Sequence, residues 1–182
     1  VLGPLLFILY VNDMNNCSDI LKFILFADDT NLFYSCNNLI GFQKTIDGEL
    51  DKLNNLFQAN KLSLNIKKTT FMLFGRKWKN VPDALTLISI DGKPIERVTS
   101  TKFLGVYIDN KLTWQTHISQ LAIKVSRNLG VLNKAKSVLS TKLLKMLYFS
   151  MAHSYLTYGI IIWGNACETK LNRIYILQKR AM

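Results

Sequence analysis

The sequence predicts an α+β fold, in which a part of mixed strands and helices over residues 1–114 precedes an all-helical part over residues 115–182. Two observations lead to this prediction. Alternating apolar residues and turn dipeptides occur before residues 112–116, whereas apolar residues recur at helical spacing after Thr116. Hydrophobic residues make up 49% of the 182 residues, which is enough to bury a core and argues against disorder.

Two helices are predicted in the mixed part. Gly3-Pro4 suits the beginning of a helix, and residues 4–14 are almost wholly apolar, so we expect this helix to be buried against a sheet. Residues 42–60 form an amphipathic helix, because their apolar residues recur at spacings of three and four. These residues are Phe42, Ile46, Leu50, Leu53 and Phe57.

Several strands are predicted between and after these helices. Alternation at residues 62–66 and an apolar run at residues 71–74 indicate extended chain that continues a sheet. Residues 85–90, followed by Asp91-Gly92 and Ile95, predict a hairpin with a common turn dipeptide. Residues 102–108 predict a further strand.

Two adjacent acids, Asp28 and Asp29, lie between the apolar runs of residues 21–26 and 32–34. The pattern predicts strand, turn and strand with the acids at the tip, although the turn lacks the glycine of a common hairpin. One interpretation is a solvated acidic turn. The other is a cation site, because paired carboxylates repel unless a cation intervenes, and Mg²⁺ prefers oxygen ligands.

The C-terminal part predicts a bundle of amphipathic helices. Apolar residues from Ile118 to Leu132 follow a helical stripe, and residues 143–155 and 171–177 predict two more helices. Basic residues lie outside the first stripe, at Lys124, Arg127, Lys134 and Lys136.

The net charge of +11 is distributed unevenly along the chain. Residues 1–60 carry three basic and seven acidic side chains, residues 61–114 carry ten and four, and residues 115–182 carry ten and one. A helical part with so large an excess of positive charge favours a polyanionic partner, because each neutralised phosphate releases counterions. A solvated basic face without a partner is the alternative.

The remaining composition excludes several classes of protein. The cysteines at Cys17, Cys36 and Cys167 are far apart and odd in number, so neither a disulfide framework nor a zinc site is expected, and a reducing, intracellular location fits. The longest apolar run, residues 5–11, is too short to span a membrane. Because the chain begins at Val1 rather than Met, we expect a piece of a longer protein.

The order of these segments resembles the reverse transcriptase domain of non-LTR retrotransposons, the LINE-type elements of the jockey-like kind. The resemblance covers essentially the whole chain and implies a partial polymerase palm, an antiparallel sheet with packing helices, followed by a helical thumb. VLGPLLFILYVND (1–13) resembles the end of motif B, FADD (26–29) motif C, ANKLSLNIKKTTFMLF (59–74) motif D and KFLGVYIDNKLTW (102–114) motif E. YGIIIWGNA (158–166) and LQKRA (177–181) resemble the thumb.

The resemblance implies an RNA-directed DNA polymerase that uses two Mg²⁺ ions, or Mn²⁺ in their place. Asp28 matches the motif C residue that binds the catalytic ions, and Asp29 matches the neighbouring carboxylate. The reaction is attack of a primer 3′-hydroxyl on the α-phosphate of a dNTP, with an RNA template. Lys68 matches the lysine proposed to protonate pyrophosphate, with Lys67 as the alternative.

The same resemblance implies contacts to substrate and nucleic acid. Substrate contacts are expected at Gly3 and Pro4 of motif B, at Ala27 and at the primer-grip turn of Phe103, Leu104 and Gly105. Lys124, Arg127, Lys134 and Lys136 are expected to follow the backbone of a hybrid duplex. Asp13, Trp114 and Trp163 are interpreted as structural residues, and the two histidines as surface or core residues of helices.

The family's motif A, with its own metal-binding aspartate, and its fingers motifs are expected upstream of Val1. We therefore expect the isolated chain to lack polymerase activity, and we expect the full protein in the cytoplasm and nucleus. A non-catalytic nucleic-acid-binding remnant of a decayed or domesticated retroelement is the alternative. A third interpretation is a protein-binding scaffold with an acidic turn, which predicts no salt-dependent binding to nucleic acid.

Overall fold

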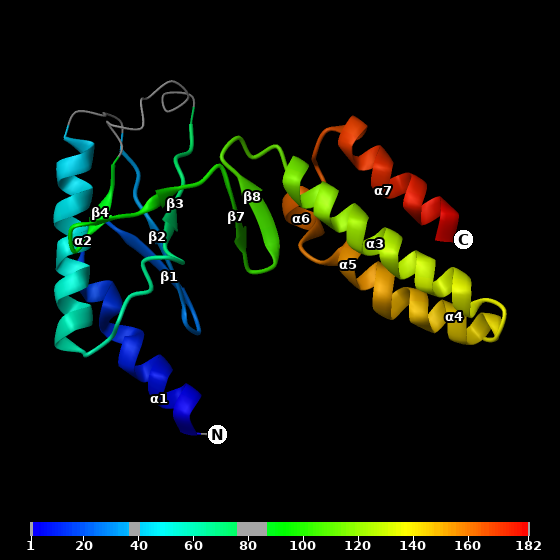
Figure 1. Ribbon diagram of the computed structural model, residues 1–182, viewed down its shortest axis with the longest axis horizontal. Helices are drawn as coiled ribbons and strands as arrows, with labels where there is room; N and C mark the ends of the chain where they lie inside the picture. Colours follow the sequence, from blue (N-terminus) through cyan, green and yellow to red (C-terminus); the bar gives the residue numbers. More distant parts are fainter. Residues whose placement is uncertain (1, 37–40, 76–86, 182) are drawn as a thin grey trace. The chain divides into compact units, whose positions relative to one another are not determined.

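The structure is a computed structural model that describes residues 2–36, 41–75 and 87–181. The chain forms two compact units (Figure 1). The first unit comprises Val1–Phe71 with Arg76–Arg97, and the second comprises Met72–Gly75 with Val98–Met182. Helices and short strands occur in both, which confirms the α+β class.

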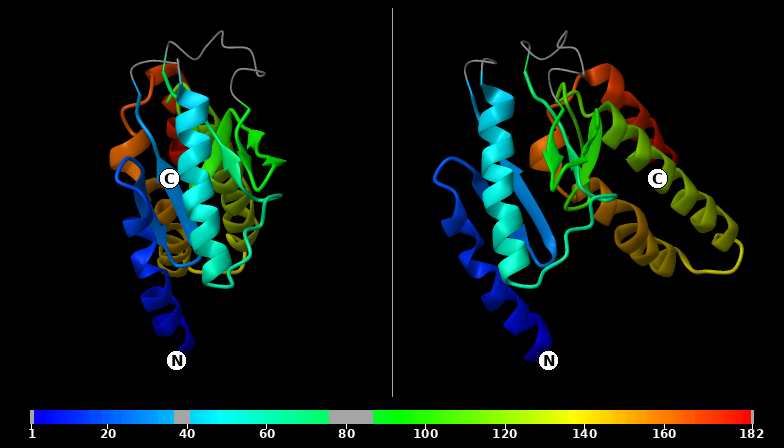
Figure 2. Two further views of the ribbon diagram at one scale, coloured as in Figure 1. Left: turned by 90° about the vertical axis from the view of Figure 1, so that its left-hand side faces the viewer. Right: turned by 60° about the vertical axis from the view of Figure 1, so that its left-hand side comes forward.

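The first unit contains two α-helices, a 3₁₀ helix and several short strands. Its helical elements are α1 (Leu2–Val11), η1 (Asn12–Cys17) and α2 (Phe42–Ala59). Its strands are β1 (Lys22–Phe26), β2 (Asp29–Phe33), β3 (Thr70–Phe71), β4 (Ser89–Ile90), β5 (Lys93–Pro94) and β6 (Glu96–Arg97). In Figure 2 the hairpin of β1 and β2 lies beside α2.

Strand pairing in the described residues is local rather than continuous. The pairs β1–β2, β4–β5 and β7–β8 are antiparallel, β3–β6 is parallel, and each pair is a separate two-stranded sheet. The sequence predicted one antiparallel sheet. The structure instead has three separate antiparallel hairpins and one parallel pair among the described residues. The palm identity of this part of the chain stays a prediction.

A small core holds the hairpin against α2 and the end of α1. Val11 and Met14 pack on Leu53 and Phe57 of α2, and the hairpin residues Phe23, Leu25 and Leu32 lie against them. The hydrophobic stripe of α2 is buried as its spacing predicts. This core fixes one face of the hairpin.

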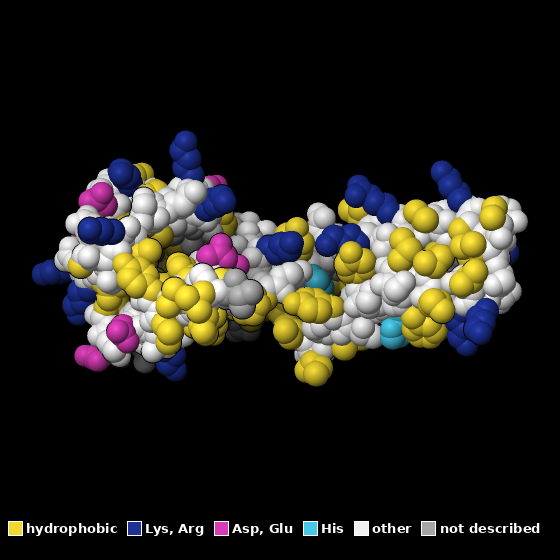
Figure 3. Space-filling model, turned by 90° about the horizontal axis from the view of Figure 1, so that it is seen from below, with side chains coloured by type: hydrophobic (Ala, Val, Ile, Leu, Met, Phe, Trp, Pro, Cys, Tyr) yellow, Lys and Arg dark blue, Asp and Glu magenta, His cyan; other side chains and the backbone are white. Residues whose placement is uncertain are grey.

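The expectation that the first helix is buried is wrong for most of α1. Only Val11 of α1 is buried, and side chains such as Leu2 and Leu9 are 67% and 64% exposed. The helix also begins at Leu2, before the predicted Gly3-Pro4 opening, and continues as η1. Hydrophobic side chains consequently gather on the face of the first unit seen in Figure 3. Apolar composition did not by itself place this helix in the core.

The second unit is a hairpin followed by helices. The hairpin is β7 (Ser100–Phe103) and β8 (Val106–Asp109). The helical elements are α3 (Gln115–Ala135), α4 (Thr141–Tyr148), the π-helical turn η4 (Phe149–His153), α5 (Ser154–Thr157), α6 (Ile160–Trp163) and α7 (Glu168–Ala181). No helix of the described residues combines the length and apolar character needed to cross a bilayer.

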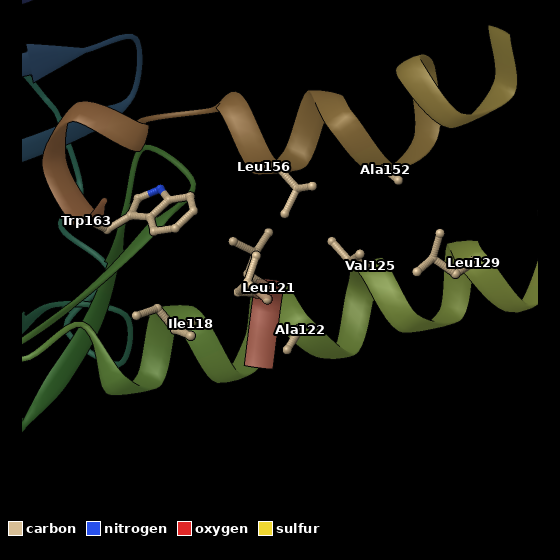
Figure 4. Packing of buried hydrophobic residues seen from close by; sticks show 9 residues of the cluster. Ile118, Leu121, Ala122, Val125, Leu129, Ala152, Leu156 and Trp163 are labelled. Carbon is tan, nitrogen blue, oxygen red and sulfur yellow. The ribbon is translucent and has the colours of Figure 1, made fainter. Parts of the chain in front are cut away.

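The core of the second unit lies between α3 and the helices that follow it. Figure 4 shows Leu121 and Val125 of α3 pointing toward Ala152 and Leu156, with Trp163 of α6 at the end of the cluster. Ile118, Ala122, Leu129 and Ile174 complete the buried set. The predicted helical stripe and the structural role of Trp163 are thereby confirmed.

Several element predictions need correction. Residues 102–108 form parts of two strands, β7 and β8, because the chain turns at Leu104-Gly105. Residues 143–155 are not one regular helix but contain the π turn η4, and α6 was not predicted. Of residues 62–66 and 71–74 only Phe71 lies in a strand. Part of the strand at residues 85–90 lies outside the described residues.

Candidate functional site

The Asp pair lies at the tip of a tight hairpin. Phe26 pairs with Asp29, so the loop consists of Ala27 and Asp28 alone. Ala27 has a φ of 52°, which supplies the positive φ that two-residue hairpin loops require, here without glycine. The ladder continues without interruption to the pair of Lys22 with Phe33. The backbone of the acids is therefore fixed by a regular antiparallel ribbon.

The two faces of this hairpin differ. Phe23, Leu25 and Leu32 face the core of the first unit. Asp29 shares the other face with Phe26, its directly opposed partner, because paired residues of an antiparallel ladder project to the same side. Phe26 and Ile24 on that face are 59% and 46% exposed. The site is thus an acidic tip at the end of an open apolar face.

Asp28 and Asp29 are both exposed, and their carboxylates have no hydrogen bond or ion pair with any described residue. Unpartnered carboxylate oxygens are the ligands that Mg²⁺ takes, usually one or two from protein with water and phosphate completing the shell. The described residues contain no group of three His, Cys, Asp or Glu side chains suited to a metal ion. The pair therefore fits part of a divalent-cation site.

Lys67 and Lys68 lie in a short turn of the first unit, just before β3. The amide of Lys68 donates to the carbonyl of Asn65 over 3.0 Å, and the Thr69 hydroxyl donates to the same carbonyl over 3.0 Å. Both lysines are exposed. The structure records no ion pair between either lysine and the Asp pair. Their catalytic role stays a prediction.

Gly3 and Pro4 lie in the first turn of α1 and are exposed. Outside the backbone of the helix itself, no atom lies within 4 Å of the position where a Cβ of Gly3 would be, so local packing does not require glycine there. Their role as substrate contacts stays a prediction, as does that of Ala27.

The predicted primer-grip residues form the tight turn between β7 and β8, in the second unit. Leu104 and Gly105 have φ values of 44° and 88°, so both loop residues are left-handed. The Tyr158 hydroxyl donates to the Leu104 carbonyl over 2.5 Å. A Cβ at Gly105 would lie 3.2 Å from Cε1 of Tyr158. Glycine is therefore favoured at position 105, because its φ is left-handed and an added Cβ would press on the Tyr158 ring.

The predicted nucleic-acid contacts are all exposed. Lys124, Arg127 and Lys134 lie on α3. The spacing puts Arg127 and Lys134 on the side opposite its buried stripe, whereas Lys124 flanks the stripe and lies over the ring of Tyr155. Lys136 caps the C-terminal end of the helix instead. Lys and Arg side chains project around the helical unit in Figure 3. The second unit carries 12 Lys and Arg residues against 2 Asp and Glu residues.

Two residues organise this unit: Asp109, which the sequence did not single out, and His117, which was expected as a surface or core residue of a helix. Asp109 is buried and accepts hydrogen bonds from the amides of Lys111, Thr113 and Trp114, the last over 2.8 Å. Its place shortly before a predicted helix was the available signal. His117 is also buried, and its Nδ1 accepts from the Tyr107 amide over 3.3 Å. Burial, and next the nearby Lys124, lower the pKa of His117.

Comparison with known proteins gives one clear family. Residues 1–108 match the family described as "Reverse transcriptase (RNA-dependent DNA polymerase)". The chain is 28% identical over 192 residues to the "Probable RNA-directed DNA polymerase from transposon BS" of Drosophila melanogaster, covering 100% of this chain and 21% of that protein. No solved structure gives a significant match.

Two further relatives from Drosophila melanogaster are similar over nearly the whole chain. The "RNA-directed DNA polymerase from mobile element jockey" is 25% identical over 193 residues, covering 100% of this chain and 20% of that protein. The "Probable RNA-directed DNA polymerase from transposon X-element" is 29% identical over 189 residues, covering 99% and 20%. The chain thus spans about a fifth of the length of these relatives. The chain belongs to the reverse transcriptase family, and its similarity to the jockey polymerase confirms the jockey-like resemblance predicted from the sequence.

Proposed function

We propose that this chain is part of an RNA-directed DNA polymerase that adds dNTPs to the 3′-hydroxyl of a DNA primer on an RNA template. The observation that carries the proposal is the Asp28-Asp29 pair, two neighbouring exposed carboxylates at a regular hairpin tip without a partner among the described residues. Such a pair in a chain of this family is well suited to bind divalent cations.

In this proposal Asp28 is the principal ligand of the two ions and Asp29 the neighbouring carboxylate. Mg²⁺ is the expected ion and Mn²⁺ the substitute. When bound, such ions activate the attacking hydroxyl and hold the leaving phosphates. The protein positions the two carboxylates, because the ladder of β1 and β2 holds the backbone of the hairpin tip in place. No reorganisation of the site is then needed during the reaction.

The other predicted residues take supporting roles. Lys68, or Lys67 in its place, protonates the departing pyrophosphate, because both are exposed cations. Phe103, Leu104 and Gly105 position the primer, and Gly3, Pro4 and Ala27 contact the substrates. The basic side of α3 follows the backbone of the template–primer hybrid. The proposed function places the full protein in the cytoplasm and nucleus.

A paramagnetic ion tests the cation site directly. We expect Mn²⁺ to broaden the amide NMR signals of Ala27 to Thr30 in the purified chain, and to do so no longer in the Asp28→Asn, Asp29→Asn variant. The matched control, Asp13→Asn with Asp51→Asn, removes the same charge from two other exposed acids of the first unit. Equal broadening in both variants would contradict a site at the hairpin tip.

We further propose that the isolated chain does not extend a primer, because the described residues supply two neighbouring carboxylates and no third ligand beside them. Incubation of the purified chain with Mg²⁺, dNTPs and a primed RNA template measures this. Efficient extension would show that two carboxylates are sufficient.

The alternative is a non-catalytic nucleic-acid-binding remnant of a retroelement. The specific observation in its favour is the charge of the second unit, with 12 basic and 2 acidic side chains. The genomic reading frame before Val1 discriminates between the two. A continuous frame that encodes a further aspartate-bearing strand supports the polymerase, and an early stop codon supports the remnant.

A further inference from the structure

A cavity of about 330 Å³ lies within the second unit, between the hairpin of β7 and β8, α3 and α5. Small-molecule sites range from about 300 to about 1,000 Å³, so this cavity admits one small ligand and not a length of duplex. Its walls are mainly aromatic and basic. The principal residues are Lys102, Tyr107, His117, Lys124, Tyr155 and Tyr158.

The charge of this cavity has one sign. Lys102 and Lys124 line it, and no Asp or Glu does. The ammonium group of Lys124 lies 5.4 Å from the centre of the Tyr155 ring, which is a cation–π contact at the wall of the cavity. An anionic group is therefore favoured inside the cavity, and a flat aromatic group is favoured against the tyrosines.

His117 lines this cavity and carries a donor that no described residue satisfies. Its side chain is 6% exposed, and Nδ1 is occupied as an acceptor for the Tyr107 amide. In the neutral ring the hydrogen is then on Nε2, which is buried and has no hydrogen-bond partner among the described residues. Buried donors are normally paired, but Nε2 has almost no accessible surface, so it lies behind the cavity wall and does not face the cavity interior.

We propose that this cavity binds a single unpaired nucleotide, with its base against the tyrosines and its phosphate oxygens toward Lys102 and Lys124. The proposal deepens the proposed function, and it rests on that function for the expectation that nucleotides reach this unit. Two sources have the required chemistry: a free mononucleotide and an unpaired nucleotide of a nucleic-acid strand.

The test uses two tyrosines in similar settings. Tyr155 lies under Lys124 in the cavity, whereas Tyr175 lies 4.4 Å under Lys179 on α7, away from it. Both rings are exposed, so Tyr155→Leu and Tyr175→Leu remove the same group without changing charge or burying a polar atom. Binding of 2′-deoxyadenosine 5′-monophosphate to the 182-residue chain is measured by calorimetry, beside 2′-deoxyadenosine, inorganic phosphate and a short oligo(dA) strand.

We expect the mononucleotide to bind more tightly than either the nucleoside or phosphate, and Tyr155→Leu to weaken it roughly tenfold while Tyr175→Leu changes it little. Tighter binding of oligo(dA) with the same dependence on Tyr155 identifies a strand as the source, and equal or weaker binding identifies the free nucleotide. Equal losses in both variants, phosphate binding as strong as nucleotide binding, or no binding would overturn the proposal.

Failure of the proposed function is measured separately. Affinity of the chain for an RNA–DNA hybrid is dominated by charge, which Tyr155→Leu leaves unchanged. Mononucleotide binding without hybrid binding would contradict the proposed function and leave the cavity assignment intact. Hybrid binding without a Tyr155-dependent nucleotide site would contradict the cavity assignment and leave the proposed function intact.

Discussion

A single buried carboxylate organises the junction of β8 and α3. Asp109 accepts from the amides of Lys111, Thr113 and Trp114 and from the Thr113 hydroxyl. Trp114, the residue before α3, has a φ of 61° and offers no side-chain cap of its own. The Asp109 carboxylate therefore holds the loop that leads into α3, up to the amide of the residue before the helix.

We expect Asp109→Ala to lower the free energy of unfolding by about 2–3 kcal/mol, because several amides lose a charged acceptor. Asp109→Asn retains one acceptor oxygen and is expected to cost less. Urea unfolding of the purified chain measures both. Glu168→Ala, an exposed acid in the first turn of α7, is the control and is expected to cost less than about 1 kcal/mol. A loss at Asp109 no larger than this control would contradict its role in holding this loop.

His117 makes stability depend on pH in a definite direction. Burial, followed by Lys124, lowers its pKa in the folded chain below the ordinary value of 6.5. Lys102 lines the same cavity and adds further positive charge. As the pH falls, the unfolded chain takes up the proton first, so the contribution of His117 is complete above the unfolded pKa and is lost through the folded pKa.

We therefore expect the free energy of unfolding to decrease between about pH 7 and about pH 5, and part of this decrease to disappear in His117→Phe. Urea midpoints of both chains across this range give the difference that belongs to His117. His153→Phe serves as the control, because His153 is only partly buried and lies against Tyr148 and Phe149. An unchanged pH dependence in His117→Phe would contradict the assignment.

At the scale of elements, the sequence predicted the long amphipathic helices α2 and α3, but it did not predict the π turn within residues 143–155. The stripes of α2 and α3 reflect one face that meets a core, so sequence spacing alone locates them. Within the π turn η4, the carbonyl of Met151 accepts a hydrogen bond over 2.5 Å from Asn128 of α3, which is a contact between elements. Spacing within one segment carries no information about such a contact.

The same distinction applies to the candidate site. The Asp28-Asp29 hairpin follows from two apolar runs and a short interval, so the sequence locates it. The turn at Leu104-Gly105 lacks the common turn dipeptides, so the predicted single strand was wrong, although the family resemblance marked those residues. The role of His117 comes from its contact with Tyr107 of another element, which no local pattern indicates. Asp109 bonds only to the loop that follows it, so its place before a predicted helix was a local signal.

Two glycines of the second unit are expected to respond in opposite directions to the same substitution. Gly105→Ala puts a Cβ 3.2 Å from Tyr158 at a φ of 88°, and we expect a loss of about 1–2 kcal/mol in the free energy of unfolding. Gly130 lies inside α3, and outside the helix backbone no atom lies within 4 Å of the position that an added Cβ would take. Gly130→Ala is therefore expected to gain about 0.5–1 kcal/mol. Urea unfolding gives both values, and changes of the same sign would contradict the hairpin geometry.

At the scale of the whole molecule, charge separates the two units more clearly than fold class does. The acids of the candidate cation site belong to the first unit, and the second unit holds 12 Lys and Arg residues against 2 Asp and Glu residues. A cation site needs local negative charge, whereas binding a phosphate backbone needs the opposite. In the proposed function, the two requirements therefore fall on different units of the chain.

This division predicts where the salt dependence of nucleic-acid binding originates. Each lysine or arginine that neutralises a phosphate adds about one counterion to the salt dependence of binding. Arg127 and Lys134 lie on the exposed side of α3, whereas Lys22 and Lys44 are exposed cations of the first unit. We expect Arg127→Gln with Lys134→Gln to reduce the slope of log affinity against log salt by about two for an RNA–DNA hybrid.

The control is Lys22→Gln with Lys44→Gln, which removes the same charge and is expected to leave the slope nearly unchanged. Fluorescence anisotropy of a labelled hybrid, titrated with the purified chain between about 50 and about 200 mM salt, measures both slopes. Equal reductions in the two variants would mean that net charge alone attracts the hybrid. A reduction confined to the α3 variant would place the phosphate backbone along that helix, because only groups in contact with phosphate release its counterions.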